Sequence, residues 1–267
     1  MTPIDFIQAD DLPWTDDAGL AAGEPPAARR LRSSGEEVVA LVDLVAGRPW
    51  QPRPDQLVSF LVLGGRVEVA GGVHGHLGFA QVCTDGATTF AAPDGARLLV
   101  FSQPGRHAPA ALAKPVDTLE VQWEIAEDPV AGIWRELTLT AAGNPAGAIA
   151  LRSLAIGDSN VTTHRHDWDE DVYVVDGERL TPAGAMTAGC YAWRPRGVWH
   201  GGFRTGSPGA LLLVRCTGET AALAGTPELS PDPLPATRLR REARLTPAAA
   251  AVTDLWRHRD ILTGRRE

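Results

Sequence analysis

Short apolar segments, separated by glycine, proline and aspartate, recur along most of the chain. They lie at residues 36–47, 56–72, 75–83, 87–93 and 96–103, and they resume at 121–126, 132–141, 148–157 and 210–219. Segments of this length, rich in valine, leucine and phenylalanine and bounded by turn residues, predict β-strands. No long helical period appears among them. The pattern therefore predicts an all-β protein.

The two ends of the chain depart from this pattern. Residues 1–35 predict an extended N-terminal lead-in, and residues 223–267 predict a strap rich in proline and arginine that ends in a short helix. Thr246 and Pro247 favour a helix start, because a hydroxyl caps the first turn and proline fits the first helical position. The apolar side of this helix would pack on a barrel or on a second subunit.

The segment from His164 to His200 carries the candidate chemistry. His164, His166 and Glu170 share parity, so on an alternating strand their side chains leave the same face. A turn at Pro195-Arg-Gly197 would bring His200 round to face them. Three imidazoles and one carboxylate that converge on one point form a site for a borderline-to-hard divalent metal.

These spacings resemble the two sequence blocks of the cupins, which are small antiparallel β-barrels. The first block, G-x5-H-x-H-x3/4-E-x6-G, matches from His164 to Gly177, except that Gly157 lies one residue too far upstream. The second block, G-x5-P-x-G-x2-H-x3-N, matches from Gly189 to His200. The resemblance implies a metal ion held by His164, His166, Glu170 and His200.

Two further residues are candidate catalytic groups. Arg204 stands where the second block ends in asparagine, four residues past His200 and therefore predicted on the same face. An inward arginine near a metal could bind a carboxylate, an enolate or another anionic oxygen, whereas the alternative is a side chain that reaches solvent at the strand end. Trp168 shares the parity of the first three ligands, which predicts either a pocket wall or ordinary barrel core.

The N-terminal half repeats parts of this pattern. FLVLGG at 60–65 parallels VYVVDG at 172–177, and Pro93-Asp-Gly95-Ala-Arg-Leu98 copies the spacing of 195–200 with leucine at the ligand position. This internal repeat predicts two tandem cupin barrels of the jelly-roll, or double-stranded β-helix, type. The first, over residues 36–120, has lost its metal ligands, and the second, over residues 121–222, is the metal-binding barrel.

One H-x-H pair lies outside this scheme. His74-Gly-His76 falls in a glycine-rich stretch after the 60–65 strand. A glycine-rich bend with exposed histidines is favoured there over a second metal site.

Net charge and cysteine content indicate which kinds of partner and which cellular compartment to expect. The net charge of −8 argues against a general nucleic-acid binder. The three cysteines, Cys83, Cys190 and Cys216, are far apart and odd in number, so no disulfide framework follows and a reducing cytoplasm is expected. We find neither a signal peptide nor an apolar run of the ~18 residues that a membrane span needs.

Two barrels with the intact site in the second resemble the ChrR-type cupins and the bicupins grouped with them. That group includes dioxygenases that cleave carbon–carbon bonds in diketones or hydroxylated aryl ketones, and zinc-binding sensor domains of anti-sigma factors. The resemblance implies one divalent ion, with Fe(II) favoured over Zn(II), Mn(II) or Ni(II). It also implies a dioxygenase acting on a small enolizable or hydroxylated carbonyl substrate, and a homodimer is the expected assembly.

Two other functions stay open at this point. The first is a non-catalytic sensor or small-molecule binder, and the second is a redox-neutral isomerase or hydrolase that uses the same metal. The first 35 residues contain no cysteine or histidine, so they lack the zinc-binding segment of an anti-sigma factor. This absence favours an enzyme over a sensor.

Overall fold

The computed structural model describes residues 4–15, 19–22, 26–105, 107, 112–128, 132–140, 143–155, 159–160 and 164–217. Within these ranges the chain forms strands β1 to β16 and one 3-10 turn, η1 (Ala9–Asp11). No helix in the described part has the length and hydropathy needed to cross a membrane. The predicted strap and C-terminal helix lie outside the described residues, and the all-β prediction is confirmed.

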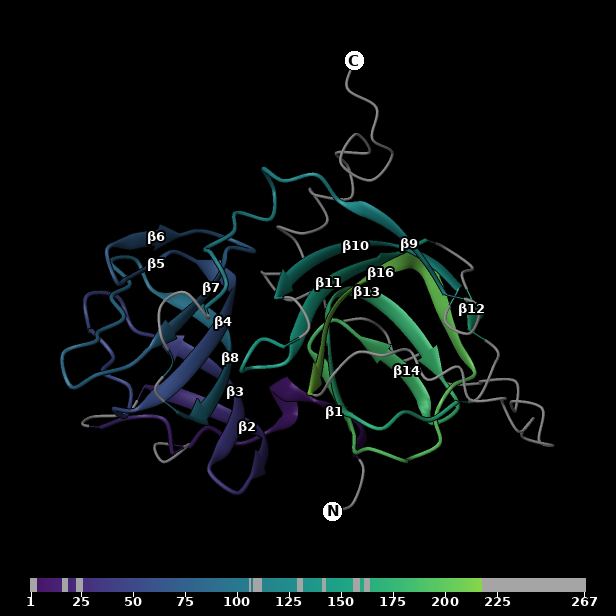
Figure 1. Ribbon diagram of the computed structural model, residues 1–267, viewed down its shortest axis with the longest axis horizontal. Helices are drawn as coiled ribbons and strands as arrows, with labels where there is room; N and C mark the ends of the chain where they lie inside the picture. The colour runs from purple at the N-terminus through teal and green to yellow at the C-terminus, as the bar shows by residue number, and fades with distance from the viewer. Residues whose placement is uncertain are drawn as a thin grey trace. The chain divides into compact units, whose positions relative to one another are not determined.

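The chain divides into two compact units. The N-terminal unit comprises residues 9–121 and 144–146, and the C-terminal unit comprises residues 1–8, 122–143 and 147–267. The strands of each unit are drawn and labelled in Figure 1. Each unit has its own hydrophobic core.

The N-terminal unit is built on a five-stranded antiparallel sheet in the order β2-β3-β8-β4-β7. Its strands are β2 (Ala27–Ser34), β3 (Glu37–Leu44), β8 (Ala96–Pro104), β4 (Gln56–Gly65) and β7 (Phe79–Cys83). A hairpin of β5 (Val67–Val69) and β6 (Gly72–His74) accompanies it. Alternate residues of β3, from Val38 to Leu44, enter one buried cluster, as the two-residue period of a strand requires.

The C-terminal unit contains a nine-stranded antiparallel sheet. Its main path runs β1 (Ile4–Gln8), β15 (Cys190–Arg194), β13 (Asp169–Thr181), β16 (Phe203–Thr217), β11 (Ala148–Leu154), β10 (Gly132–Thr140) and β9 (Glu124–Asp128). β12 (Ser159–Asn160) also pairs with β16, and β14 (Gly184–Thr187) pairs with β13. In Figure 1 the strands of this unit curve around a common interior.

The predicted lead-in over residues 1–35 contains regular structure, which corrects that expectation. β1 pairs antiparallel with β15 of the C-terminal unit, with Gln8 opposite Cys190. Phe6 packs against the core of that unit. β2 starts at Ala27, ahead of the boundary drawn at residue 36. Both strands are interrupted by charged residues, so their apolar pattern is weak and only pairing with neighbouring strands reveals them.

Strand register shows which residues of the two units are equivalent. Gly65 of β4 lies opposite Ala96 of β8, and Gly177 of β13 lies opposite Ala210 of β16. Counting along the strands from these two pairs, the Val58–Ser102 pair takes the place of the Glu170–Cys216 pair. The isolated bridge between Trp50 and Phe90 lies just before β4 and β8, as the bridge between His164 and His200 lies just before β13 and β16.

The N-terminal unit therefore has apolar residues where the second unit has its candidate ligands. Trp50, Val58 and Phe90 are all buried in one cluster. The ring centroids of Trp50 and Phe90 lie 4.7 Å apart, and those of Phe60 and Phe90 lie 5.3 Å apart. These large side chains fill the space with hydrophobic contacts, which suits a stable core rather than a ligand site.

Leu98 is not the equivalent of His200, so the predicted repeat was wrong at that position. Leu98 lies within β8, opposite Val42 and Val62, in the interior of its sheet. The reason is that proline and glycine precede more than one paired position in a barrel. Counted from the Gly65–Ala96 and Gly177–Ala210 pairs, Gly95 corresponds to Gly209 within β16, rather than to Gly197 in the turn before His200.

A close backbone approach at Gly177 leads to a stability prediction. A Cβ atom there would lie 2.1 Å from the Gly209 carbonyl oxygen, and the residue has a φ of 78°. Gly197 has nearly the same φ, 77°, but a Cβ there would meet nothing within 4 Å. We expect Gly177→Ala to lower the free energy of unfolding by about 3 kcal/mol and Gly197→Ala by about 1 kcal/mol, measured by chemical denaturation. Equal losses would show that backbone conformation alone sets the cost.

Candidate metal centre

An antiparallel bridge sets two of the candidate ligands side by side. The His164 N–H donates to the His200 carbonyl at 2.7 Å, and the His200 N–H donates to the His164 carbonyl at 2.9 Å. Their ring centroids are 4.4 Å apart. The Gly197 N–H also donates to the His166 carbonyl at 2.8 Å, which anchors the turn before His200 to the histidine pair. The predicted return of His200 toward the first block is confirmed.

Glu170 comes from the middle of the sheet. It is the second residue of β13, with Arg194 of β15 opposite on one side and Cys216 of β16 opposite on the other. Pairing on both sides fixes the strand, and side chains two residues apart share a face. Glu170 therefore projects to the same side as Val172, and both line one cavity.

Two histidines present unpaired ring nitrogens to this side. Nδ1 of His166 lies 2.7 Å from the Trp168 carbonyl oxygen, and Nδ1 of His200 lies 2.9 Å from the Val198 carbonyl oxygen. A carbonyl only accepts, so each Nδ1 carries the proton and each Nε2 keeps its lone pair. Both Nε2 atoms are buried with no hydrogen-bond partner among the described residues. Metal-ligating histidines commonly have this arrangement, with the second nitrogen held by a carbonyl.

The donor atoms of His166, Glu170 and His200 converge. All of them lie within 4.8 Å of one another, and Nε2 of His200 is 3.7 Å from Oε2 of Glu170. In the part of the chain that the structure describes, no other group of three histidine, cysteine or acidic residues meets this criterion. His164 lies beside the cluster, with its ring centroid 6.2 Å from that of His166.

The environment of His166, Glu170 and His200 gives these side chains the protonation states that metal binding requires. Burial lowers the pKa of His200 to about 4 and also lowers the pKa of His166, although Glu170 acts in the opposite direction on both. Both imidazoles are thus neutral near pH 7. Burial acts to raise the pKa of Glu170, but the attraction of Arg194, followed by the histidines, outweighs it and holds this pKa well below its usual range. The cluster offers neutral nitrogens and an ionised carboxylate.

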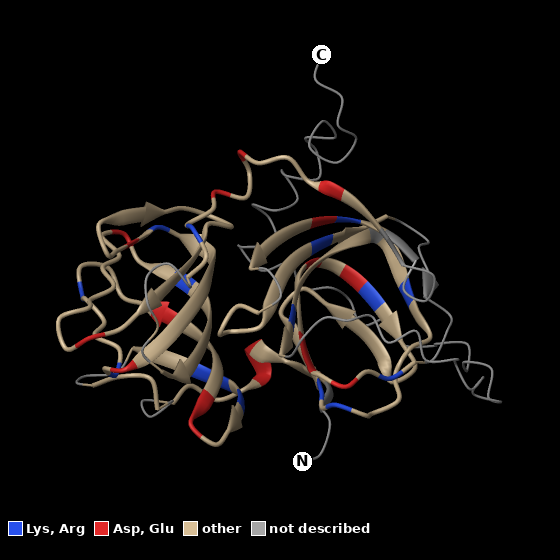
Figure 2. Ribbon diagram, in the orientation of Figure 1, with Lys and Arg blue, Asp and Glu red and all other residues tan. Residues whose placement is uncertain are grey.

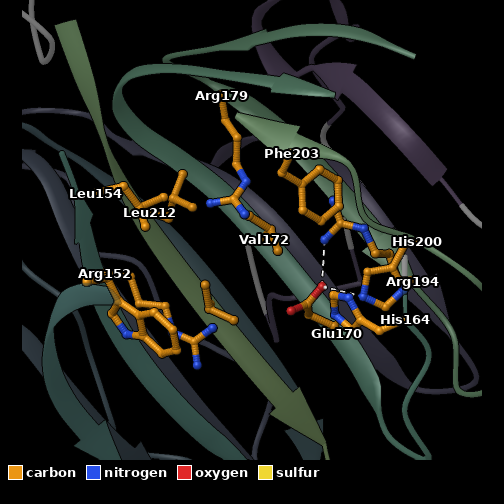
Figure 3. A pocket seen from close by; sticks show the side chains of 12 residues that line it. Arg152, Leu154, His164, Glu170, Val172, Arg179, Arg194, His200, Phe203 and Leu212 are labelled. Atoms are coloured by element: carbon orange, nitrogen blue, oxygen red, sulfur yellow. Dashed lines mark hydrogen bonds and ion pairs between the residues drawn. The ribbon is translucent and has the colours of Figure 1, made fainter. Parts of the chain in front are cut away.

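The cluster opens onto a small cavity (Figure 3). Its volume of about 60 Å³ has room for about five water molecules. Its apolar wall consists of Trp134, Leu154, Val172, Phe203, Leu212 and Val214. Its polar groups are His164, Glu170, His200 and three arginines, Arg152, Arg179 and Arg194. The cavity combines a hydrocarbon wall with three guanidinium groups and the candidate ligands.

The sequence did not predict the contacts that two of these arginines, Arg179 and Arg194, make in the cavity. Nη1 of Arg194 donates to Oε2 of Glu170 at 2.6 Å, inside the cluster. The guanidinium carbons of Arg179 and Arg194 lie 4.7 Å and 4.8 Å from the centre of the Phe203 ring. Arg152, by contrast, is paired with Glu136 at 2.8 Å, where charges of opposite sign lie next to each other on β10 and β11 (Figure 2). The one available signal was the position of Arg194 directly before the Pro-x-Gly turn.

Arg204 does not face the cavity, so its predicted inward position is wrong. Its side chain is exposed, whereas its neighbour Phe203 is buried and lines the cavity. Gly201 and Gly202, with φ values of 143° and 67°, break the alternation that would have placed Arg204 on the face of His200. The outward alternative considered from sequence is the correct one.

Trp168 belongs to the core behind the cluster rather than to the cavity wall. Its ring stacks on His166 with a centroid distance of 4.5 Å and an interplanar angle of 3°, and it packs against the core of its unit. Of its two predicted locations, the structure shows the core. Through this stacking and its backbone carbonyl, Trp168 holds the ring of His166 in place.

Among the described residues, the H-x-H pair of the N-terminal unit belongs to no such cluster, and the predicted exposure of His74 is wrong. His74 is buried and lies edge-on to Phe60. Nδ1 of His76 lies 3.1 Å from the Leu63 carbonyl oxygen. Burial lowers the pKa of both histidines, as expected of neutral core residues.

Comparison with solved structures shows the fold of the chain. A candidate dioxygenase from Nostoc punctiforme matches with a TM-score of 0.68 and 12% identity over 82% of this chain and 84% of that chain. A cupin 2 conserved barrel domain protein from Leptotrichia buccalis matches with a TM-score of 0.53 and 14% identity over 81% and 98%. A point mutant of the Bacillus subtilis oxalate decarboxylase matches with a TM-score of 0.54 and 12% identity over 81% and 77%.

No protein-family model and no curated protein sequence matches the chain. The likeness is therefore one of structure: the chain has the all-β barrel fold of the cupins, as predicted from the two sequence blocks. The narrower resemblance to ChrR-type cupins stays a prediction.

Proposed function

We propose that this chain is a mononuclear metal enzyme of the dioxygenase type, in which His164, His166, Glu170 and His200 hold one divalent ion, with Fe(II) favoured. Its substrate is a small enolizable or hydroxylated carbonyl compound. The observation that carries the proposal is the pair of buried, unpartnered Nε2 atoms of His166 and His200 among the described residues, set beside an ionised carboxylate. A homodimer and a cytoplasmic location stay predictions.

The residues present fit a divalent ion. Buried polar nitrogens without partners cost free energy, and a metal that accepts their lone pairs removes this cost. Imidazole nitrogens with one carboxylate oxygen suit iron, manganese, nickel or zinc, and a set without sulfur is typical of catalytic rather than structural zinc sites. When bound, the ion supplies Lewis acidity and redox chemistry with O2.

The chain itself supplies orientation and a dry surface. The Trp168 and Val198 carbonyls hold the rings of His166 and His200 in one tautomer. Arg194 holds the Glu170 carboxylate in place through Nη1. The apolar wall contributed by β10, β11, β13 and β16 receives the carbon skeleton of the substrate and keeps water away from the reacting atoms.

The structural neighbours support this reaction class without establishing it. The protein from Nostoc punctiforme is named a candidate dioxygenase, and the Bacillus subtilis enzyme is named an oxalate decarboxylase. Because one cupin fold hosts many reactions, the assignment to this chain depends on its own site.

An oxygen-uptake assay tests the proposal. Iron-loaded protein, prepared without air, is mixed with diketones and hydroxylated aryl ketones in an oxygen electrode cell, and zinc-loaded protein serves as the control. We expect oxygen uptake that matches substrate loss for the iron form and none for the zinc form. Turnover of these substrates by both forms in the absence of oxygen would instead identify a redox-neutral enzyme.

A further inference from the structure

Two arginines share one aromatic ring at the wall of the cavity. Arg179 comes from β13 and Arg194 from β15, and their guanidinium carbons lie 4.7 Å and 4.8 Å from the Phe203 ring centre. In Figure 3 both side chains point toward the space beside Phe203. A planar guanidinium against an aromatic face keeps a restricted orientation, so the two forks are positioned before any ligand arrives.

Arginines dominate the polar lining of this cavity. Arg152, Arg179 and Arg194 line it together with the carboxylate of Glu170. Arg152 is paired with Glu136, and Arg194 is paired with Glu170. Guanidinium groups in a small, partly apolar space favour an anionic ligand. A divalent ion in the cluster would add further positive charge.

We propose that Arg179 and Arg194 form a carboxylate-binding subsite beside Phe203, and that the substrate is a small organic acid. This inference deepens the proposed function and rests on it, because the other end of the acid would carry the carbonyl or hydroxyl group that faces the ligand cluster. A planar guanidinium matches a carboxylate through two parallel N–H···O bonds.

Arg194 connects this subsite to the ligand cluster. It contacts Oε2 of Glu170 through Nη1 at 2.6 Å, and a guanidinium offers five N–H donors in all. One side chain can therefore hold Glu170 and bind a ligand carboxylate at the same time. Arg179 approaches the same carboxylate from β13, at the end of the cavity marked by Phe203, while the ion pair that holds Glu170 belongs to Arg194. Arg179 is thus the residue whose replacement tests the subsite with the least effect on the ligand cluster.

Calorimetric titration with malonate tests the inference, with malonamide as the uncharged compound of matched shape and inorganic phosphate as a second anion. The proteins are manganese-loaded wild type, Arg179→Met, and the control Arg204→Met, which removes an exposed arginine next to Phe203. We expect the Kd for malonate to rise at least about tenfold in Arg179→Met and to stay unchanged in Arg204→Met. Malonamide and phosphate should bind at least about tenfold more weakly than malonate to the wild type.

Three outcomes would overturn the subsite. They are equal affinity for malonate and malonamide, unchanged malonate affinity in Arg179→Met, and an equal loss in Arg204→Met. Phosphate binding as tight as malonate binding would refute the carboxylate assignment. Arg179→Lys keeps the positive charge but loses the pair of parallel N–H donors, so it should recover only part of the malonate affinity. This variant also serves as a control in case Arg179→Met fails to fold.

Measurement of the metal content distinguishes a failure of the carboxylate subsite from a failure of the proposed function. Each protein is analysed for manganese before and after titration. A wild type that binds no metal refutes the proposed function, and the same titrations on metal-free protein then decide the subsite by the same comparison of variants. A metal-loaded wild type that does not distinguish malonate from malonamide refutes the subsite and leaves the metal centre standing.

Discussion

Replacement of His200 by alanine is expected to remove the bound metal. Wild-type protein, purified without air and without added metal, should carry about one divalent ion per chain, and the variant close to none. His200 contributes one of two buried Nε2 atoms in the cluster that have no hydrogen-bond partner among the described residues, and this atom lies 3.7 Å from Oε2 of Glu170. Loss of a residue that only orients a ligand costs about 10–100-fold in metal affinity, so loss of the ligand itself should cost more. Elemental analysis measures the result.

The chain offers a matched control in His76. Its Nδ1 also contacts a backbone carbonyl, that of Leu63, and its Nε2 is also buried without a partner among the described residues. However, it belongs to the N-terminal unit and to no group of ligands in the described part of the chain. His76→Ala should keep the metal. Retention of the metal in His200→Ala, or its loss in His76→Ala, would contradict the ligand assignment.

The other ligands extend the same prediction. His166→Ala and Glu170→Ala should also lose the metal and retain the far-ultraviolet circular dichroism of an all-β protein. The fold should survive because β13 and β16 pair along most of their length independently of these side chains. If both variants kept full metal content, the four-ligand site would be refuted.

The ligand cluster could be predicted because its determinants are local. His164 and His166 are two residues apart, Glu170 follows at the start of a strand, and a glycine turn returns His200 to the same place. Strand alternation and turn chemistry connect such spacings to geometry without knowledge of the sheet. The same reasoning failed for Arg204, because two glycines with positive φ reset the alternation just after His200.

The arginines could not be predicted in the same way. Arg194 meets Glu170 only because β15 lies next to β13 in a particular register. Arg179 reaches Phe203 because β13 continues past its bulges beside β16. Register between distant strands depends on the whole packed sheet, which spacing along one strand does not encode. The pairing of β1 with β15 was missed for the same reason.

The second prediction with a large expected effect concerns a buried ion pair on β13, the strand that carries Glu170. Asp171 and Arg215 face each other across β13 and β16, each only 1% exposed, with Nη1 3.2 Å from Oδ2. The hydroxyl of buried Tyr191 on β15 also donates to Asp171. Asp171 follows Glu170 directly and leaves the opposite face of the strand. Asp171, Arg215 and Tyr191 therefore connect the neighbouring strands β13, β16 and β15 on the face of the sheet opposite to Glu170.

Asp171→Ala is expected to lower the free energy of unfolding by about 3–5 kcal/mol, because it leaves the Arg215 charge buried without this carboxylate. Chemical denaturation measures the loss, and the double variant Asp171→Leu/Arg215→Met should regain part of it by replacing the buried ion pair with apolar packing. Folded Asp171→Ala should still bind about one metal ion, since Glu170 keeps its pairing to β15 and β16. Unchanged stability would show that the buried pair contributes little. Loss of metal from the folded variant would instead show that the contacts of Asp171 with Arg215 and Tyr191 set the position of Glu170.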